Sequence, residues 1–189
     1  MDLLHIHDQY YSKINRFIAT LVRDDWTADD LVQEVFIKID RHIDSLKDKK
    51  KLGPWIYKIA YHISMDHLKN KNTRLYKQSK ELTNQRSGIL IEKKIQQHQM
   101  GHCVRQKVEL LPDNYKIPLI LFDFEGFSHK EIAGILGITE ENTKIRLHRA
   151  RKELKKILKN ECSFEKDERD VFVCLPKMTF IKKDNTDAS

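Results

Sequence analysis

Basic side chains gather on one face of a helix predicted near the end of the sequence, where they could contact a polyanion. This face carries Lys144, Arg146, His148, Arg149, Arg151, Lys152 and Lys155. Apolar residues recur at spacings of four and three along the other face: Leu147, Ala150, Leu154 and Ile157. Lysine and arginine bind phosphates, and arginine can also donate two hydrogen bonds to guanine. The pattern predicts a DNA-contacting helix, although a basic face is often only solvated.

The residues just before this helix predict how it is positioned. Ser128 and Glu131 have the spacing of a capping box, which predicts the start of a short helix. Gly137 can take the left-handed conformation that ends this helix and reverses the chain. Thr139 can then cap the basic helix. Together, residues 127–158 are typical of a helix-turn-helix.

A second set of polar residues lies on a helix predicted near the start of the chain. Thr27 and Asp30 have the spacing of a capping box, and apolar residues follow at helical intervals. Asp30, Gln33 and Glu34 fall on the opposite, solvent-facing side.

Aromatic residues and cations alternate on the helix predicted to begin at Gly53-Pro54. They are Trp55, Tyr57 and Tyr61, followed by Lys69, Lys71 and Arg74. Two interpretations stay open for the aromatic side chains. They pack in the core, or they form a surface on which unpaired bases stack while the cations hold the backbone.

Three cysteines complete the residues with distinctive chemistry. Cys103 follows His102, and Cys162 and Cys174 lie near the C-terminus. Thiolates with an adjacent imidazole could bind Zn²⁺ or copper, or the thiols could sense redox state. Buried or inert thiols are the alternative, because the spacing differs from that of a zinc ribbon.

The remaining features predict an all-α chain of two small helical domains. We expect domains at 1–74 and 100–159, a flexible linker at 75–99, and a cysteine-containing, partly disordered tail at 160–189. The net charge of +7 favours a nucleic acid or an anionic membrane surface as partner. Without a signal-peptide pattern or a span of membrane length, we expect a cytoplasmic protein.

Three stretches in order resemble the extracytoplasmic-function (ECF) type of sigma factor within the sigma-70 family. They are DDLVQEVFIKI, WIYKIAYHISMDHLK, and LPDNYKIPLILFDFEGFSHKEIAGILGITEENTKIRLHRARKEL, within residues 10–158. The cysteines resemble those of a subset with a C-terminal extension. The resemblance implies a first domain, sigma region 2, that binds the β′ coiled coil of RNA polymerase and melts the minus-ten promoter element. A second domain, sigma region 4, would bind the β flap and read the minus-thirty-five element.

The resemblance also implies roles for residues of this chain. Polymerase binding falls to Asp30, Gln33 and Glu34. Minus-ten recognition and melting fall to Trp55, Tyr61, His62, Asp66, Lys69, Lys71 and Arg74. Minus-thirty-five recognition falls to Asn142, Lys144, Arg146, His148, Arg149 and Arg151. The chain departs from the family pattern at Tyr61-His62, where an Arg-Asn pair is usual, and at Asn142 and Thr143, where we still expect the helix to form.

The function expected is therefore promoter selection rather than catalysis, in response to a stress or envelope signal. No cofactor is required on this view, with Zn or Cu possible at the cysteines, and an anti-sigma protein is a possible partner. The alternative is a stand-alone helix-turn-helix regulator with a metal- or redox-sensing tail. A metalloenzyme fits less well, because the sequence lacks an HExxH motif and a glycine-rich phosphate loop.

Overall fold

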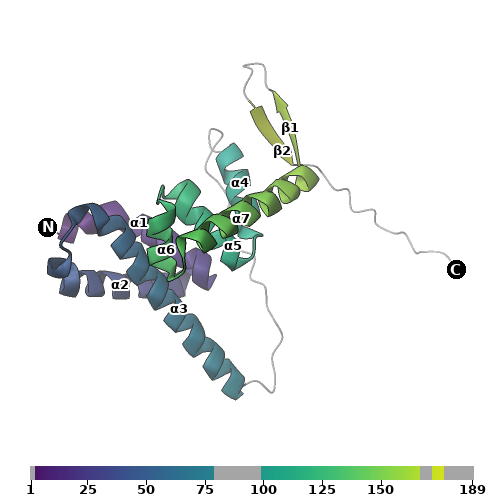
Figure 1. Ribbon diagram of the computed structural model, residues 1–189. Coiled ribbons are helices and arrows are strands. Elements are labelled where there is room, and N and C mark those ends of the chain that lie inside the picture. Colours follow the sequence, from purple (N-terminus) through teal and green to yellow (C-terminus); the bar gives the residue numbers. More distant parts are fainter. Residues whose placement is uncertain (1–2, 79–98, 167–171, 177–189) are drawn as a thin grey trace.

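The computed structural model describes residues 3–78, 99–166 and 172–176, with side chains described over 3–71 and 104–160. The described residues form helices and, at the C-terminal end, one pair of β-strands (Figure 1). The prediction of an all-α fold in two helical regions is confirmed. The strand pair is an addition to it.

The first region contains three long helices and two short 3₁₀ turns. They are α1 (Leu3–Val22), α2 (Asp25–His42), η1 (Ile43–Ser45), η2 (Lys49–Lys51) and α3 (Leu52–Gln78). Helix α3 starts next to Gly53-Pro54, as predicted. The end of α3 extends away from the other helices (Figure 1).

The start of α2 differs from the prediction. Asp24, rather than Thr27, is the N-cap residue, and its carboxylate accepts hydrogen bonds from the Thr27 backbone N–H at 2.9 Å and from the Thr27 hydroxyl. Asp30 then lies one turn further into the helix. The local reason is that Asp24 has the extended backbone of an N-cap, whereas Thr27 already lies within the helix.

The second region contains four helices and a π-helical turn. They are α4 (Gln99–Glu109), α5 (Asp113–Leu119), the π turn η3 (Ile120–Phe124), α6 (His129–Leu136) and α7 (Glu140–Glu161). Pro118 lies in the last turn of α5, directly before η3. Because proline cannot donate to the helical ladder, its position accounts for a change of helix geometry here.

The helix-turn-helix forms as predicted. The Ser128 hydroxyl accepts from the Glu131 backbone N–H, and the Glu131 carboxylate accepts from the Ser128 N–H at 2.8 Å. Gly137 ends α6 with φ of 67°. The Thr139 hydroxyl accepts from the Asn142 backbone N–H at 3.1 Å, so Thr139 caps α7.

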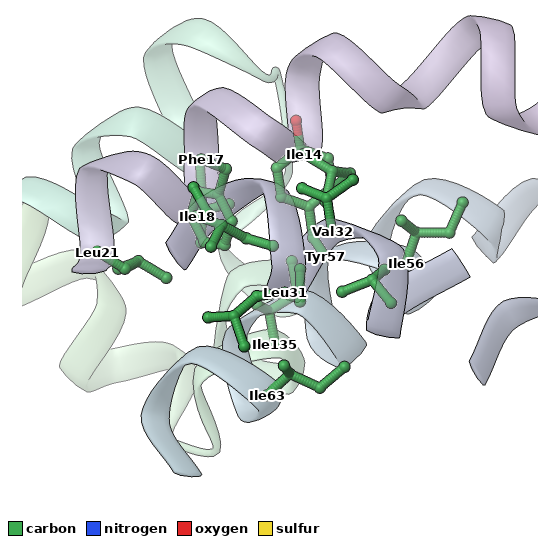
Figure 2. Close-up of a cluster of buried hydrophobic side chains, with 14 of the residues drawn as sticks. Ile14, Phe17, Ile18, Leu21, Leu31, Val32, Ile56, Tyr57, Ile63 and Ile135 are labelled. Atoms are coloured by element: carbon green, nitrogen blue, oxygen red, sulfur yellow. The ribbon is translucent and has the colours of Figure 1, made fainter. Parts of the chain in front are cut away.

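One hydrophobic core joins the two regions. Buried side chains of α1, α2 and α3 form a cluster with Ile117, Leu121, Ile132, Ile135 and Leu136 of the second region. Figure 2 shows Ile135 of α6 in the same cluster as Leu31 of α2 and Ile63 of α3. A smaller core lies within the second region and includes Val108, Leu111, Leu119, Leu147 and Ala150.

The C-terminal segment continues from α7 into a β-hairpin. Strand β1 (Cys162–Lys166) pairs antiparallel with β2 (Phe172–Pro176). Part of the tail at 160–189, which the sequence predicts to be partly disordered, therefore forms strands. Most of the predicted linker, residues 79–98, lies outside the described residues.

Candidate nucleic-acid and protein interfaces

The basic face of α7 is solvent-exposed where the sequence predicts DNA contact. Lys144, His148 and Arg149 are exposed, whereas Leu147 and Ala150 are buried against the second core. Lys144 forms an ion pair with Glu140 at 3.2 Å, one turn earlier. Such exposed pairs are weak, so the Lys144 ammonium remains available to a phosphate.

Two arginines of the predicted set are held by neighbouring side chains. The Arg151 guanidinium donates to Asp123 of η3 at 2.8 Å and lies 5.0 Å from the centroid of the Phe122 ring. Arg146 is half-buried and donates from Nε to the Asn142 Oδ1 at 3.0 Å. In this arrangement Arg151 supports the packing of α7 on η3, and Asn142 orients Arg146.

Thr143 explains how α7 tolerates its departure from the family pattern. Its side chain is fully buried, and its hydroxyl donates to the Thr139 backbone carbonyl at 3.2 Å. A buried hydroxyl that is satisfied within its own helix leaves the ladder intact. The expectation that the helix survives this residue is confirmed.

On α3, the aromatic residues divide between the two interpretations. Tyr57 is buried in the shared core, where it packs against Phe17 with ring centroids 5.1 Å apart. Trp55 and Tyr61 are half-buried, and His62 is exposed. Tyr61 and His62 form an edge-on pair with centroids 5.7 Å apart, and His62 Nδ1 lies 2.7 Å from the Lys58 carbonyl oxygen. Tyr57 is therefore a core residue, and the polar edge of α3 lies around His62.

The predicted cations and acid of α3 follow this edge. Asp66, Lys69 and Lys71 are exposed on the half of the helix that extends from the body. Arg74 belongs to α3, but its side chain lies outside the described side chains. The exposed part of the set therefore forms a polar rim along α3.

The two predicted DNA-binding surfaces meet at one cavity. A cavity of about 250 Å³ lies between α3 and the second region, and its lining includes Tyr61 and Met65 of α3 together with Asn114, Leu136 and Arg146. Tyr61 belongs to the predicted minus-ten set and Arg146 to the minus-thirty-five set. The sequence could not predict this proximity, because it depends on how the two regions pack.

Specific contacts hold the two regions together. Phe127 packs edge-on against Tyr57 with centroids 5.0 Å apart, and a Cβ built on Gly53 would lie 3.4 Å from the Phe127 ring. Arg23, after α1, forms an ion pair with Asp113 of α5 at 3.1 Å. Asp113 also pairs at 3.1 Å with Lys116, whose side chain is 1% exposed. Apolar packing and this ion-pair network both join the regions.

Helix α2 presents the predicted acceptors to solvent. Asp30, Gln33 and Glu34 are all exposed, and Glu34 pairs with Lys38 at 3.6 Å. Two large apolar residues of α2 are also exposed and were missed by the sequence analysis: Trp26 is 85% exposed and Ile37 is 50% exposed. Trp26 and Ile37 lie on the side of the helix opposite Val32 and Val35. This helical spacing could have identified them as exposed.

The predicted metal ligands lie outside what the structure tests. The backbones of His102, Cys103, Cys162 and Cys174 belong to α4, β1 and β2, but their side chains are not described. Among the described residues, no three histidine, cysteine or acidic side chains group as a metal site. Metal binding at the cysteines therefore stays a prediction.

None of the helices within the described residues has the length and apolar character needed to cross a membrane.

The helix-turn-helix with a basic second helix, packed on a separate three-helix region, defines the class as a DNA-binding protein with two helical regions. Both regions match known protein families. Residues 6–74 match Sigma-70 region 2, and residues 101–154 match Sigma-70 region 4. These matches coincide with α1–α3 and with most of α4–α7.

Relatives and solved structures agree with this assignment. RNA polymerase sigma factor SigZ of Bacillus subtilis is 32% identical over 174 residues, which cover 88% of this chain and 93% of SigZ. The ECF sigma factor SigM of the same organism is 30% identical over 159 residues, 82% of this chain and 94% of SigM. The sigma factor RpoE of Bartonella quintana, solved with the anti-sigma factor NepR, has a similar fold, with a TM-score of 0.67 at 22% identity, covering 84% of this chain and 97% of RpoE. The chain belongs to the sigma-70 family of RNA polymerase sigma factors, to its ECF type. Its function is to direct RNA polymerase to specific promoters.

Proposed function

We propose that the two regions divide promoter recognition as the family resemblance implies. Helix α7 reads the minus-thirty-five element through its exposed face, with His148 and Arg149 at base edges and Lys144 at the phosphates. The observation that supports this most directly is the exposure of these side chains on a helix anchored by Leu147 and Ala150.

Helix α3 takes the minus-ten non-template strand. Tyr61 offers a ring for stacking, and His62 offers an imidazole for hydrogen bonding, in place of the usual Arg-Asn pair. The exposed Asp66, Lys69 and Lys71 continue along the strand, together with Arg74. Captured bases offset part of the free energy of unpairing, so melting needs no catalytic group.

Polymerase binding falls to α2. Its exposed Asp30, Gln33 and Glu34 suit a basic helical surface. Because the polymerase holds both regions, two weak DNA contacts become one selective contact through a high effective concentration.

Run-off transcription with core RNA polymerase tests this proposal. Core polymerase with the full chain should initiate at discrete promoters, and His62→Ala should reduce open-complex formation more than initial binding. The stand-alone regulator predicts a different result: a dimer on palindromic DNA that needs no core polymerase. That result would contradict the proposal.

Regulation is proposed to act through a protein partner in the cytoplasm. Solved structures of similar fold include the sigma factor RpoE in complex with the anti-sigma factor NepR, and CnrH in complex with the cytosolic domain of CnrY. We infer that this chain also has an anti-sigma partner, released by a stress or envelope signal. Co-purification of the tagged chain from its native host, with and without envelope stress, would identify that partner.

The cysteine-containing tail supports a second proposal, a metal site. In the hairpin register Cys162 pairs with Pro176 and Phe164 pairs with Cys174, so both cysteines belong to one face of the hairpin. Strand β2 lies beside α4, the helix that contains His102 and Cys103. This backbone arrangement brings the elements that carry all three thiols together, as a Zn²⁺ or copper site requires.

The metal content of the purified chain tests the proposed metal site at the cysteines. The full chain should retain close to one equivalent of Zn²⁺ or copper after dialysis, and Cys162→Ser and Cys174→Ser should each lose it. A metal-free chain whose transcription activity is unchanged by metal or oxidant would contradict a sensing role.

A further inference from the structure

Helix α2 has an outer face that combines apolar and acidic side chains. Trp26, Asp30, Gln33 and Ile37 follow one another at spacings of four, three and four residues, so they form one stripe along the helix. The buried residues Ala28, Leu31, Val32, Val35 and Ile39 lie on the other side. The stripe therefore faces away from the core of the described residues.

Exposure of these two apolar residues has no explanation within the fold. Trp26 is 85% exposed and Ile37 is 50% exposed, and they are two of the five large apolar residues that are exposed among the described side chains. Single exposed apolar residues are common on protein surfaces. Two of them on one stripe, on either side of Asp30 and Gln33, form a continuous surface with an apolar side chain at each end and polar side chains between them.

The charge of α2 indicates what the stripe faces. The helix carries five acids, Asp25, Asp29, Asp30, Glu34 and Asp40, against Lys38 and Arg41, whereas the whole chain has a net charge of +7. Asp25 in the first turn also suits the helix dipole. The later acids flank the stripe, and they favour a basic protein partner over DNA.

The spacing of the anchors gives the shape of the partner. Ile37 lies eleven positions after Trp26, which corresponds to about 16 Å along a helix axis. A single straight helical surface can contact both anchors over this length. Tryptophan also binds a guanidinium over its ring and is enriched among the residues that dominate binding energy.

We infer that Trp26 and Ile37 are apolar anchors of the polymerase interface, placed on either side of Asp30 and Gln33. This inference rests on the proposed function, which assigns Asp30, Gln33 and Glu34 to polymerase, and it adds two residues and a geometry. The partner surface is a basic helix with an apolar or arginine-lined site for Trp26 and an apolar site for Ile37 about three turns away.

Affinity for core RNA polymerase tests the inference. Trp26→Ala and Ile37→Ala should each raise the dissociation constant about tenfold. Leu4→Ala is the matched control, because Leu4 is 74% exposed but lies on α1, outside the α2 stripe, and it should stay within about twofold of the unaltered chain. All three variants alter exposed residues, so circular dichroism should give unfolding midpoints close to that of the unaltered chain.

Salt dependence separates the anchors from the charges. Asp30→Ala should weaken binding and also reduce its dependence on salt, whereas Trp26→Ala should weaken binding and leave the salt dependence unchanged. If Asp30→Ala weakens binding while Trp26→Ala and Ile37→Ala bind normally, the inference is wrong and the proposed function stands. If the unaltered chain does not bind core polymerase, both are wrong.

A probe at Trp26 gives an independent measurement. The chain has two tryptophans, so a Trp55→Phe variant grown with 5-hydroxytryptophan carries the probe only at position 26. Because this probe is excited at wavelengths that ordinary tryptophan absorbs weakly, it can be followed in the complex. Acrylamide quenching should fall several-fold when core polymerase is saturating, and unchanged quenching in that complex would overturn the inference.

Discussion

Asp24 makes the start of α2 depend on the ionisation of one carboxylate. Hydrogen bonds from the Thr27 hydroxyl and backbone N–H lower the pKa of Asp24 below its ordinary value, with smaller contributions from Lys71 and His67. Because the pKa is lower in the folded state, this carboxylate stabilises the fold fully above the unfolded-state pKa of about 3.9. The stabilisation is lost as the pH falls from that value through the folded-state pKa.

Asp24→Asn tests this dependence, since asparagine retains a cap acceptor but has no charge. At pH 7 the variant should unfold at a lower temperature than the unaltered chain. The difference should shrink as the pH is lowered from about 5 towards 2, measured by thermal denaturation with circular dichroism. A difference that stays constant over this range would show that the charge has no role.

The buried hydroxyl of Tyr57 lowers the stability of the fold at the contact between the two regions. Its hydroxyl is buried and has no hydrogen-bond partner among the described residues, and burial, with the nearby Glu125 carboxylate, raises its pKa. Tyr57→Phe should therefore leave stability unchanged or raise it by about 1 kcal/mol, because the lone buried hydroxyl is removed and the packing on Phe127 is kept. Urea denaturation measures this, and a loss above about 1 kcal/mol would reveal a partner for the hydroxyl.

Helix α7 shows how an element determines what its arginines can do. Arg149 is exposed on the outer face, whereas Arg151 donates to Asp123 and covers Phe122. Arg149→Ala should weaken promoter binding by holoenzyme about tenfold or more and relax sequence preference at one position of the minus-thirty-five element. Arg151→Ala should mainly lower the melting temperature, by a few degrees.

Electrophoretic mobility shift with systematically altered promoters, alongside thermal denaturation, distinguishes the two variants. Lys156→Ala serves as a matched control, because Lys156 is an exposed cation of α7 outside the predicted basic face and pairs with Glu153. Equal effects of Arg149→Ala and Arg151→Ala on promoter binding would show that Arg151 leaves Asp123 in the complex.

Local elements were predictable because short-range chemistry determines them. The Ser128–Glu131 capping box, Gly137 and the apolar face of α7 depend on residues within a few positions of one another. The cap of α2 was assigned wrongly because Asp24 and Thr27 are both suitable residues three positions apart, and only backbone conformation distinguishes them. The Arg151–Asp123 contact could not be predicted, because the two residues lie 28 positions apart in sequence.

At the scale of the whole molecule, the contact between regions was beyond sequence reasoning. Ile132, Ile135 and Leu136 of α6 are buried, but the apolar pattern of the sequence does not specify whether they face α7 or α3. The structure packs them with the first region. Each buried aliphatic side chain contributes about 1.5–3 kcal/mol, so separating the regions costs several kcal/mol.

If α3 takes the minus-ten element and α7 reads the minus-thirty-five element, as proposed, this contact is incompatible with simultaneous reading of both. Tyr61 and Arg146 line the same cavity, whereas minus-ten and minus-thirty-five elements lie about 25 base pairs apart, or roughly 85 Å in B-form DNA at 3.4 Å per base pair. On the proposed function, the regions therefore separate when the chain engages a promoter. Contacts with polymerase and DNA have to offset the lost packing, including the Phe127–Tyr57 contact and the Arg23–Asp113 ion pair.

Energy transfer between dyes on the two regions measures this separation. Dyes at Lys47→Cys and Lys156→Cys, both exposed, in a chain whose native cysteines are replaced by serine, should show high transfer in the free chain. Transfer should fall strongly in the holoenzyme bound to promoter DNA. Phe127→Ala, which removes the ring between Gly53 and Tyr57, should lower transfer in the free chain by shifting the population towards separated regions. Equal transfer in the free and promoter-bound chain would show that the regions stay packed during initiation.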